Sequence, residues 1–365
     1  MRPTQSLLLA ILPLLSSAAV GCGDKDDDSG TDVTTQAGNA CISVEEDAAC
    51  PDPSDVDKSA MQGSCGSEVV RVTGEGTYED NINWWAADTG EMQPGCCYPV
   101  QETEPTCVYG RPLLVDGAAR LAEVVADKGW AATLQAELGD VPEPVRAELL
   151  ARWTRAALDE HASVAAFSKV ALDLMRFGAP PDLLARTHQA ALEEVRHAEL
   201  GFAVASAVAG RPVGPGTYRL DAVPLAGSLA EVAVAAAREG CIGEALASLL
   251  AREGARRTAD PTLREVLTII AEDEERHALL AWSTVRWAVQ TGGPSVRAAV
   301  AQVFAEAAQA GIAVPEAPDA DLSRWGLLSR SDAEGLGRAC LAEVILPAAA
   351  VLLGAPVVEG QVAVA

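Results

Sequence analysis

The feature that most constrains this chain is a six-residue motif that occurs twice, 80 residues apart. Residues 193–198 read Glu-Glu-Val-Arg-His-Ala, and residues 273–278 read Asp-Glu-Glu-Arg-His-Ala. On an α-helix, positions i and i+3 share a face, so each copy presents one carboxylate and one imidazole in the same direction. The resulting pairs are Glu194 with His197, and Glu274 with His277. Because the chain contains only four histidines, the motif uses half of them.

Each copy has a glutamate upstream, on the helix expected to precede it. Glu160 lies 34 residues before Glu194, and Glu244 lies 30 residues before Glu274. Four carboxylates in an apolar core would be costly or would protonate, whereas two divalent cations would neutralise them. Carboxylate and imidazole ligands without thiolate favour iron, or alternatively manganese, and four helices carrying this set are typical of dimetal bundles. Glu239 competes with Glu244, whose depth in the bundle fits better. The predicted ligands of two metal ions are Glu160, Glu194, His197, Glu244, Glu274 and His277.

From about residue 112 the hydrophobic pattern becomes helical. Helices are expected near 117–137, 144–177, 182–209, 227–257, 261–290, 294–311 and 332–353. Residues 210–226 have no helical period and are long enough to run the length of a bundle. A long crossover between two hairpins predicts an all-α, ferritin-like four-helix bundle with its core in 144–290 and flanking helices within 112–365. The apolar stretch 341–358 is expected to pack as a helix, and no run after the N-terminus is expected to span a bilayer.

The residues beside the ligands add a resemblance to a known family. An acid directly before each ligating Glu, and an Arg directly before each His, resemble the oxygen-activating di-iron carboxylate proteins of the ferritin-like superfamily. The resemblance covers residues 144–290. It implies that Glu193 and Asp273 accept hydrogen bonds from the ligating histidines, and that Arg196 and Arg276 hold those acids in place. It further implies O2 or peroxide chemistry rather than plain iron storage. The only tyrosine after residue 110 is Tyr218, so a tyrosyl radical inside the bundle has no evident position.

The N-terminus predicts export and a lipid anchor. Arg2 precedes an apolar stretch from Leu7 to Leu15, and residues 19–22 read Ala-Val-Gly-Cys, which resembles a bacterial lipobox. Residues 1–21 would be the signal peptide, Cys22 the lipidated residue, and 22–38 an acidic flexible tether. An ordinary secretory signal is the alternative. Either reading places the mature protein outside the cytoplasm, and the lipid anchor predicts the bacterial cell envelope. The net charge of −25 argues against nucleic acid as a partner.

Residues 39–110 form a small Cys-rich module that precedes the helices. An even number of cysteines in a short exported segment predicts up to three disulfides of undetermined connectivity. The candidates are Cys41, Cys50, Cys65, Cys96, Cys97 and Cys107. Short strands are expected near 67–72 and 83–85. Cys241, three residues before Glu244, is expected to be a buried thiol, with a disulfide to Cys340 as the rival.

These observations predict a binuclear non-haem metal oxidoreductase, most simply a di-iron enzyme that activates O2 or peroxide. Two other classes stay open. One is an envelope metal-handling protein, meaning a ferroxidase or an iron-binding protein, or instead a dimanganese catalase-like peroxide scavenger. The other is a structural or interaction lipoprotein whose dimetal site only stabilises the bundle. The expected partners are O2 or H2O2, metal cations, a membrane reached through the anchor and, as an open alternative, a second copy of the chain. The sequence identifies no electron donor.

Overall fold

A computed structural model describes the chain in two compact units. The residues described are 2–15, 35–43, 49–56, 69–83, 92–103, 112–115, 118–127, 129–130, 141–218, 220, 223–312, 314 and 322–354. One unit, 1–20 with 108–113 and 119–365, is predominantly helical, and the other, 21–107 with 114–118, contains a small sheet. Each unit is treated below by itself.

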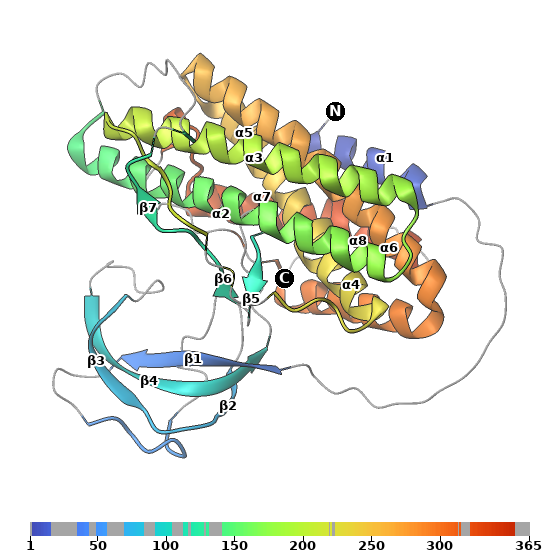
Figure 1. Cartoon of the computed structure of the whole chain (residues 1–365), viewed down its shortest axis with the longest axis horizontal. Helices are drawn as coiled ribbons and strands as arrows, with labels where there is room; N and C mark the ends of the chain where they lie inside the picture. Colours follow the sequence, from blue (N-terminus) through green and yellow to red (C-terminus); the bar gives the residue numbers. More distant parts are fainter. Residues whose placement is uncertain are drawn as a thin grey trace. The chain divides into compact units, whose positions relative to one another are not determined.

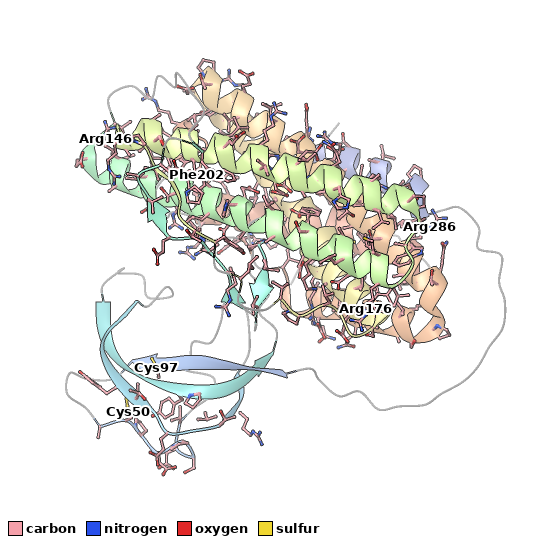
Figure 2. All side chains as sticks on the ribbon, viewed as in Figure 1. Cys50, Cys97, Arg146, Arg176, Phe202 and Arg286 are labelled. Atoms are coloured by element: carbon pink, nitrogen blue, oxygen red, sulfur yellow. A yellow bond between two sulfur atoms is a disulfide. The ribbon has the colours of Figure 1, made fainter. Side chains whose placement is uncertain are left out.

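The first helical hairpin consists of α2 (Glu143–Arg176) and α3 (Pro181–Ala209), which lie side by side along most of their length (Figure 1). Gly178 ends α2 with a φ of 71°, a left-handed conformation that glycine adopts without strain, and prolines open α3. Arginines fix both ends of α2. Arg146 donates to the carbonyl of Val208 at 3.1 Å and Arg176 donates to that of Ala226 at 2.8 Å (Figure 2).

The second hairpin runs through α4 (Leu229–Ala235), the π-helix η2 (Ala236–Glu244) and α5 (Ala245–Arg257), and returns in α6 (Pro261–Ala310). Asp260 is the N-cap of α6, because its Oδ1 accepts from the backbone N–H groups of Thr262 and Leu263 at 2.8 and 2.9 Å. The predicted helices 261–290 and 294–311 are joined in α6 across a kink at Gly293, whose φ is 66°. The π-helical stretch was not predicted, and its last residue is Glu244.

The prediction of a helix over 117–137 is wrong for the residues described there. Residues 118–127 contain β6 (Ala118–Ala119) and β7 (Val124–Val125), and β5 (Leu114–Val115) precedes them. β7 pairs antiparallel with β8 (Gly214–Pro215), which belongs to the crossover between the two hairpins. A Cβ on Gly214 would come within 2.9 Å of Asp127, so the glycine permits this close approach. Pairing with the crossover therefore overrides the helical propensity of an Ala-rich segment.

An outer layer packs on the second hairpin. It comprises η3 (Ser323–Trp325), α7 (Arg330–Cys340), the π-helix η4 (Leu341–Ile345) and α8 (Leu346–Leu353). By length and composition the span Arg330–Leu353 could cross a bilayer, with a mean hydropathy of 1.9, which corrects the expectation that no later run could do so. Val344 and Ile345 are fully buried in the core shared with α6, as expected for a packed helix. Residues 355–358 of the expected apolar helix lie outside the described residues.

The segment expected to be a signal peptide forms α1 (Pro3–Leu15) and packs on this outer layer. Leu7, Ile11 and Leu15 form one buried stripe along it. Near its start, Thr4 Oγ1 donates to Glu343 Oε2 at 2.5 Å. Near its end, the Arg286 guanidinium donates to the carbonyl of Leu14. The folded helical unit therefore contains α1 as one of its elements.

The sheet unit has β4 (Met92–Thr103) at its centre, paired antiparallel with β1 (Thr35–Ser43), β2 (Val69–Val72) and β3 (Thr77–Asn83). The expected strand near 67–72 is confirmed as β2, and Asn83 ends β3, whereas Trp84 and Trp85 lie outside the described residues.

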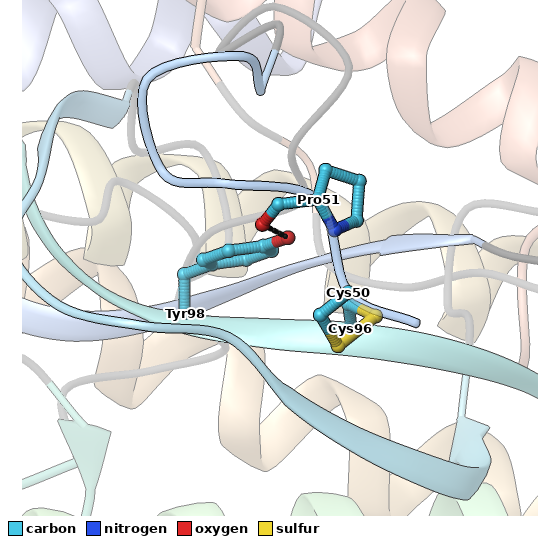
Figure 3. The surroundings of a disulfide bond; sticks show 4 residues. All are labelled: Cys50, Pro51, Cys96 and Tyr98. Atoms are coloured by element: carbon cyan, nitrogen blue, oxygen red, sulfur yellow. Dashed lines mark hydrogen bonds between the residues drawn. A yellow bond between two sulfur atoms is a disulfide. The ribbon is translucent and has the colours of Figure 1, made fainter. Parts of the chain in front are cut away.

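One predicted disulfide is observed, between Cys50 and Cys96, beside the buried Tyr98 whose hydroxyl donates to the carbonyl of Pro51 at 2.8 Å (Figure 3). Cys97 is also disulfide-bonded. Cys41 lies in β1, but its side chain is outside the described residues. The other candidates that lie wholly outside them are Cys22, Cys65 and Cys107.

Candidate metal centre

All six predicted ligands meet at one place, inside the helical unit. Their donor atoms form two groups, each with every atom within 4.8 Å of the others. The first group is Glu160, Glu194, His197 and Glu274, and the second is Glu194, Glu244, Glu274 and His277. Glu194 and Glu274 belong to both groups, so they would bridge two bound ions, with Glu160 and Glu244 as terminal ligands. Glu239, the alternative to Glu244, belongs to neither group.

Each of the four helices supplies its part of this arrangement. Glu160 comes from the middle of α2, and the first motif copy comes from α3. Glu244 ends η2, and the second copy lies on α6. The i, i+3 spacing directs both imidazole Nδ1 atoms inward, with His197 Nδ1 3.5 Å from Glu194 and His277 Nδ1 3.1 Å from the same carboxylate. The two rings lie 5.9 Å apart between centroids.

The inward-facing atoms lack the partners that buried polar atoms ordinarily have. Among the described residues, no hydrogen-bond partner is found for either oxygen of three of the glutamates, for one oxygen of the fourth, or for the inward nitrogen of each histidine. The atoms concerned are Glu160 Oε2, both carboxylate oxygens of Glu194, Glu244 and Glu274, and Nδ1 of His197 and His277. Buried polar groups are almost always satisfied, so a cluster of orphaned donors and acceptors that converges on two points fits two bound cations.

The outward nitrogens of both histidines are held by the predicted acids, and each acid comes from the opposite motif copy. His197 Nε2 lies 3.0 Å from Asp273 Oδ2, and His277 Nε2 lies 2.9 Å from Glu193 Oε2. These contacts leave Nδ1 of each ring free to face a metal, which is the usual function of an acid behind a ligating histidine. The motif spacing alone did not indicate that the pairs cross between helices.

A single arginine secures both acids. The Arg276 guanidinium donates to Glu193 at 2.9 Å and also contacts Asp273, so it joins the two motif copies. Arg196, for which the same function is predicted, is exposed, and no contact between it and either acid is found among the described residues. The repeat is symmetric in sequence, but its surroundings are not. α6 packs against α8, η4 and α1, whereas the main neighbours of α3 among the described elements are α2 and α6.

Burial and proximity set the protonation of the cluster when no metal balances its charge. Burial raises the pKa of Glu160 and of Glu244 well above their usual range, and the neighbouring carboxylates add to both shifts. Burial opposes the charged forms of His197 and His277, but the surrounding carboxylates outweigh it and raise both pKa values. Against the same burial, these imidazoles lower the pKa of Glu194. The cluster therefore holds protons where it would otherwise hold metal.

The remaining sequence candidates lie outside the two groups. His161 packs its ring edge-on against Trp130 and Tyr218, with centroids 4.9 and 5.4 Å away, as expected for a packing residue. His188 is exposed on α3. Cys241 and Cys340 are both buried and neither forms a disulfide, which confirms the buried-thiol expectation and excludes the rival disulfide. The contact of Phe167 with the His277 ring, 5.1 Å between centroids, had no signal in the sequence pattern.

Fold and site together define a mostly helical protein with a buried carboxylate–histidine cluster that can bind metal. No protein-family model, curated protein or solved structure matches the chain.

Proposed function

We propose that the protein is a binuclear non-haem metalloprotein of the ferritin-like kind, and that it uses two iron ions to reduce O2 or peroxide. The observation that carries the proposal is the pair of four-residue groups sharing Glu194 and Glu274. Two metal positions joined by two bridging carboxylates suit a pair of cations that act on one small oxidant. Iron is favoured over zinc or copper by oxygen-rich, thiolate-free ligation, and manganese is the alternative metal.

The chain itself supplies position and electrostatics. Two iron ions held here would supply the electrons for reducing a bound oxidant. Glu194 and Glu274 would hold the ions at a fixed separation, and the two histidines would be kept in the correct ring orientation by Asp273 and Glu193. The helices around the cluster exclude bulk water and thereby strengthen each electrostatic contact.

Three alternatives differ in what they require of the centre. A dimanganese catalase-like centre disproportionates peroxide and needs no external reductant. An envelope ferroxidase or iron-binding protein would release its metal as product. A structural site would have saturated, inaccessible ligands, but Glu160 retains an exposed edge, with 14% of its side chain accessible. This exposure favours a centre that exchanges with solvent over a purely structural one.

For location, we propose an exported lipoprotein of the cell envelope, anchored through Cys22. The support is the lipobox-like sequence, the acidic segment after it and the disulfide between Cys50 and Cys96, which is typical of an oxidising compartment. Mass spectrometry of the membrane fraction tests this proposal. A mature chain that begins at a diacylated Cys22 is expected, whereas a soluble chain retaining residues 1–21 would contradict it.

Metal analysis tests the dimetal proposal directly. The protein is produced with iron or with manganese supplied, beside a Glu194→Ala/His277→Ala variant. As a matched control, Glu199→Ala/His188→Ala changes the same residue types at exposed positions of α3. About two ions per chain are expected in the parent and the control, and close to none in the ligand variant. Fewer than about 0.2 ions per chain in the parent under both supplies would refute a dimetal centre.

The chemistry is tested with the metal-loaded protein. The anaerobic di-ferrous form is titrated with H2O2, and the expected end point is one peroxide per two ferrous ions, because each peroxide takes two electrons and yields two water molecules. A manganese-loaded protein that instead releases one O2 for every two peroxides would establish the catalase-like alternative. Bound iron and bound manganese that both fail to react with H2O2 would indicate the structural alternative.

A further inference from the structure

The two terminal glutamates of the centre differ in their access to solvent. Glu160 has 14% of its side chain exposed, whereas Glu244 is completely buried. Every other ligand side chain is at most 1% exposed. The Glu160 side chain therefore has an edge that contacts solvent, although its inward oxygen Oε2 is buried, whereas the Glu244 side chain has no such edge.

The layers around each glutamate explain the difference. Glu244 ends η2, where Cys241 and Ser248 on either side of it are also buried. Cys241 belongs to the apolar core that η2 shares with α6, η4 and α8, so a complete helical layer covers this side. The side of the site behind Glu244 is therefore closed to solvent.

The flank of α2 beside Glu160 is covered differently. Val164, one turn beyond Glu160, is only partly buried. In the part of the chain that the structure describes, short segments lie on this flank. Leu113 donates its N–H to the carbonyl of Ala162 at 3.2 Å, and the rings of Trp130 and Tyr218 pack against His161. Cover of this kind is thinner than a packed helical layer and leaves the Glu160 edge exposed.

We propose that the metal position held by Glu160 is the exchangeable one, and that the position held by Glu244 is kinetically closed. The inference rests on the proposed dimetal function and adds to it the direction from which cations and a small oxidant arrive. A metal ion leaves a protein site when water or a chelator replaces its ligands one at a time. Replacement can begin at a carboxylate that already contacts solvent, but a sealed carboxylate requires the helices to open first. The bridging residues hold both ions and do not distinguish them.

Release kinetics with zinc, a redox-inert probe, test the proposal. The full chain is loaded with two Zn2+ ions and mixed with excess colorimetric chelator, and the release is followed with time. Two phases of equal amplitude are expected, one ion per chain leaving at least ten times faster than the other. Release of both ions in a single phase would overturn the inference.

Two matched variants assign the phases. Glu160→Gln and Glu244→Gln each replace one terminal carboxylate by a neutral group of the same shape. With Glu160→Gln the fast phase should disappear and one slowly released ion should remain. With Glu244→Gln the single remaining ion should leave fast. The opposite assignment, or identical rates in the two variants, would overturn the inference.

Anomalous diffraction gives an assignment that needs no variant. Crystals of the zinc-loaded protein are soaked briefly in chelator, and the position beside Glu160 should lose its anomalous signal first. Loss beside Glu244 first would contradict the proposal. A parent protein that binds no zinc, iron or manganese at all would refute the proposed function itself, whereas two bound ions that leave together would refute only the difference between the positions.

Discussion

Metal uptake by this protein should release protons, and their number follows from the cluster. Without metal, burial raises the pKa of Glu160 and Glu244, and the surrounding carboxylates raise that of His197 and His277, against the opposing effect of burial. All four groups are therefore shifted toward their protonated forms when no metal is bound. Each must lose its proton to become a ligand, because metals bind carboxylates and neutral imidazoles. Two divalent cations carry the same charge as four protons, so the exchange leaves the charge of the cluster unchanged.

The magnitude follows from linkage. If four protons leave when two ions bind, the overall binding constant falls by about 10⁴ for each pH unit below neutrality, about 1.4 kcal/mol for each proton. The sign is set by the raised pKa values. Raised pKa values favour the protonated forms in the metal-free protein, and lowering the pH makes their protons harder to displace.

Calorimetry measures the proton count. Titration of the metal-free protein with Mn2+ at one pH, in buffers that differ in ionisation enthalpy, should give a slope of about four protons per two ions. A Glu244→Gln variant removes one of the four groups and should lower both the proton count and the number of ions. If the parent protein released fewer than two protons on binding two ions, its glutamates and histidines would already be deprotonated, which would refute the reasoning.

Four further outcomes are expected. Asp273→Asn should weaken metal binding about 10- to 100-fold by loosening a ligating histidine, with Glu199→Gln as an exposed control, and equal affinities would contradict this. Chelation should lower the melting temperature, since free metal at 100 times its Kd stabilises the folded state by about 2.7 kcal/mol, and an unchanged melting curve would argue against binding. Asp260→Ala should cost about 1 kcal/mol in denaturant unfolding through loss of the α6 N-cap, and no loss would show the cap to be dispensable. Cys50→Ser should destabilise the sheet unit by about 2–5 kcal/mol, measured by proteolysis, while the metal content of the helical unit stays the same.

The ligand set could be predicted because its signal is local. The distance between a glutamate and a histidine on one helix is fixed by the helical repeat, and burial of such groups has few explanations other than metal. The upstream glutamates followed from matching depths along two hairpins, and Glu244 was preferred over Glu239 on that basis. The structure groups these residues as expected.

What the sequence missed depends on contacts between distant segments. The local pattern over 117–137 is helical, but the strand pair formed by β7 and β8 depends on the crossover, whose position is not encoded in that segment. The repeat likewise predicts the same function for Arg196 and Arg276. Only Arg276 lies where it can reach both acids, because the two motif copies have different neighbours. Local symmetry therefore predicted the ligands but not the support behind them.

The position of α1 has a consequence for the timing of biogenesis. A leader is recognised through its apolar residues, but in the folded helical unit Leu7, Ile11 and Leu15 are buried, and polar contacts hold α1 near both ends. Folding and recognition by an export apparatus would compete for the same three side chains. If the chain folded before the export apparatus bound it, the apolar residues of the leader would be buried. Export would therefore have to occur while the outer layer is still unfolded. Slowing the folding of that layer should then raise the exported fraction, and speeding it should retain the precursor inside the cell.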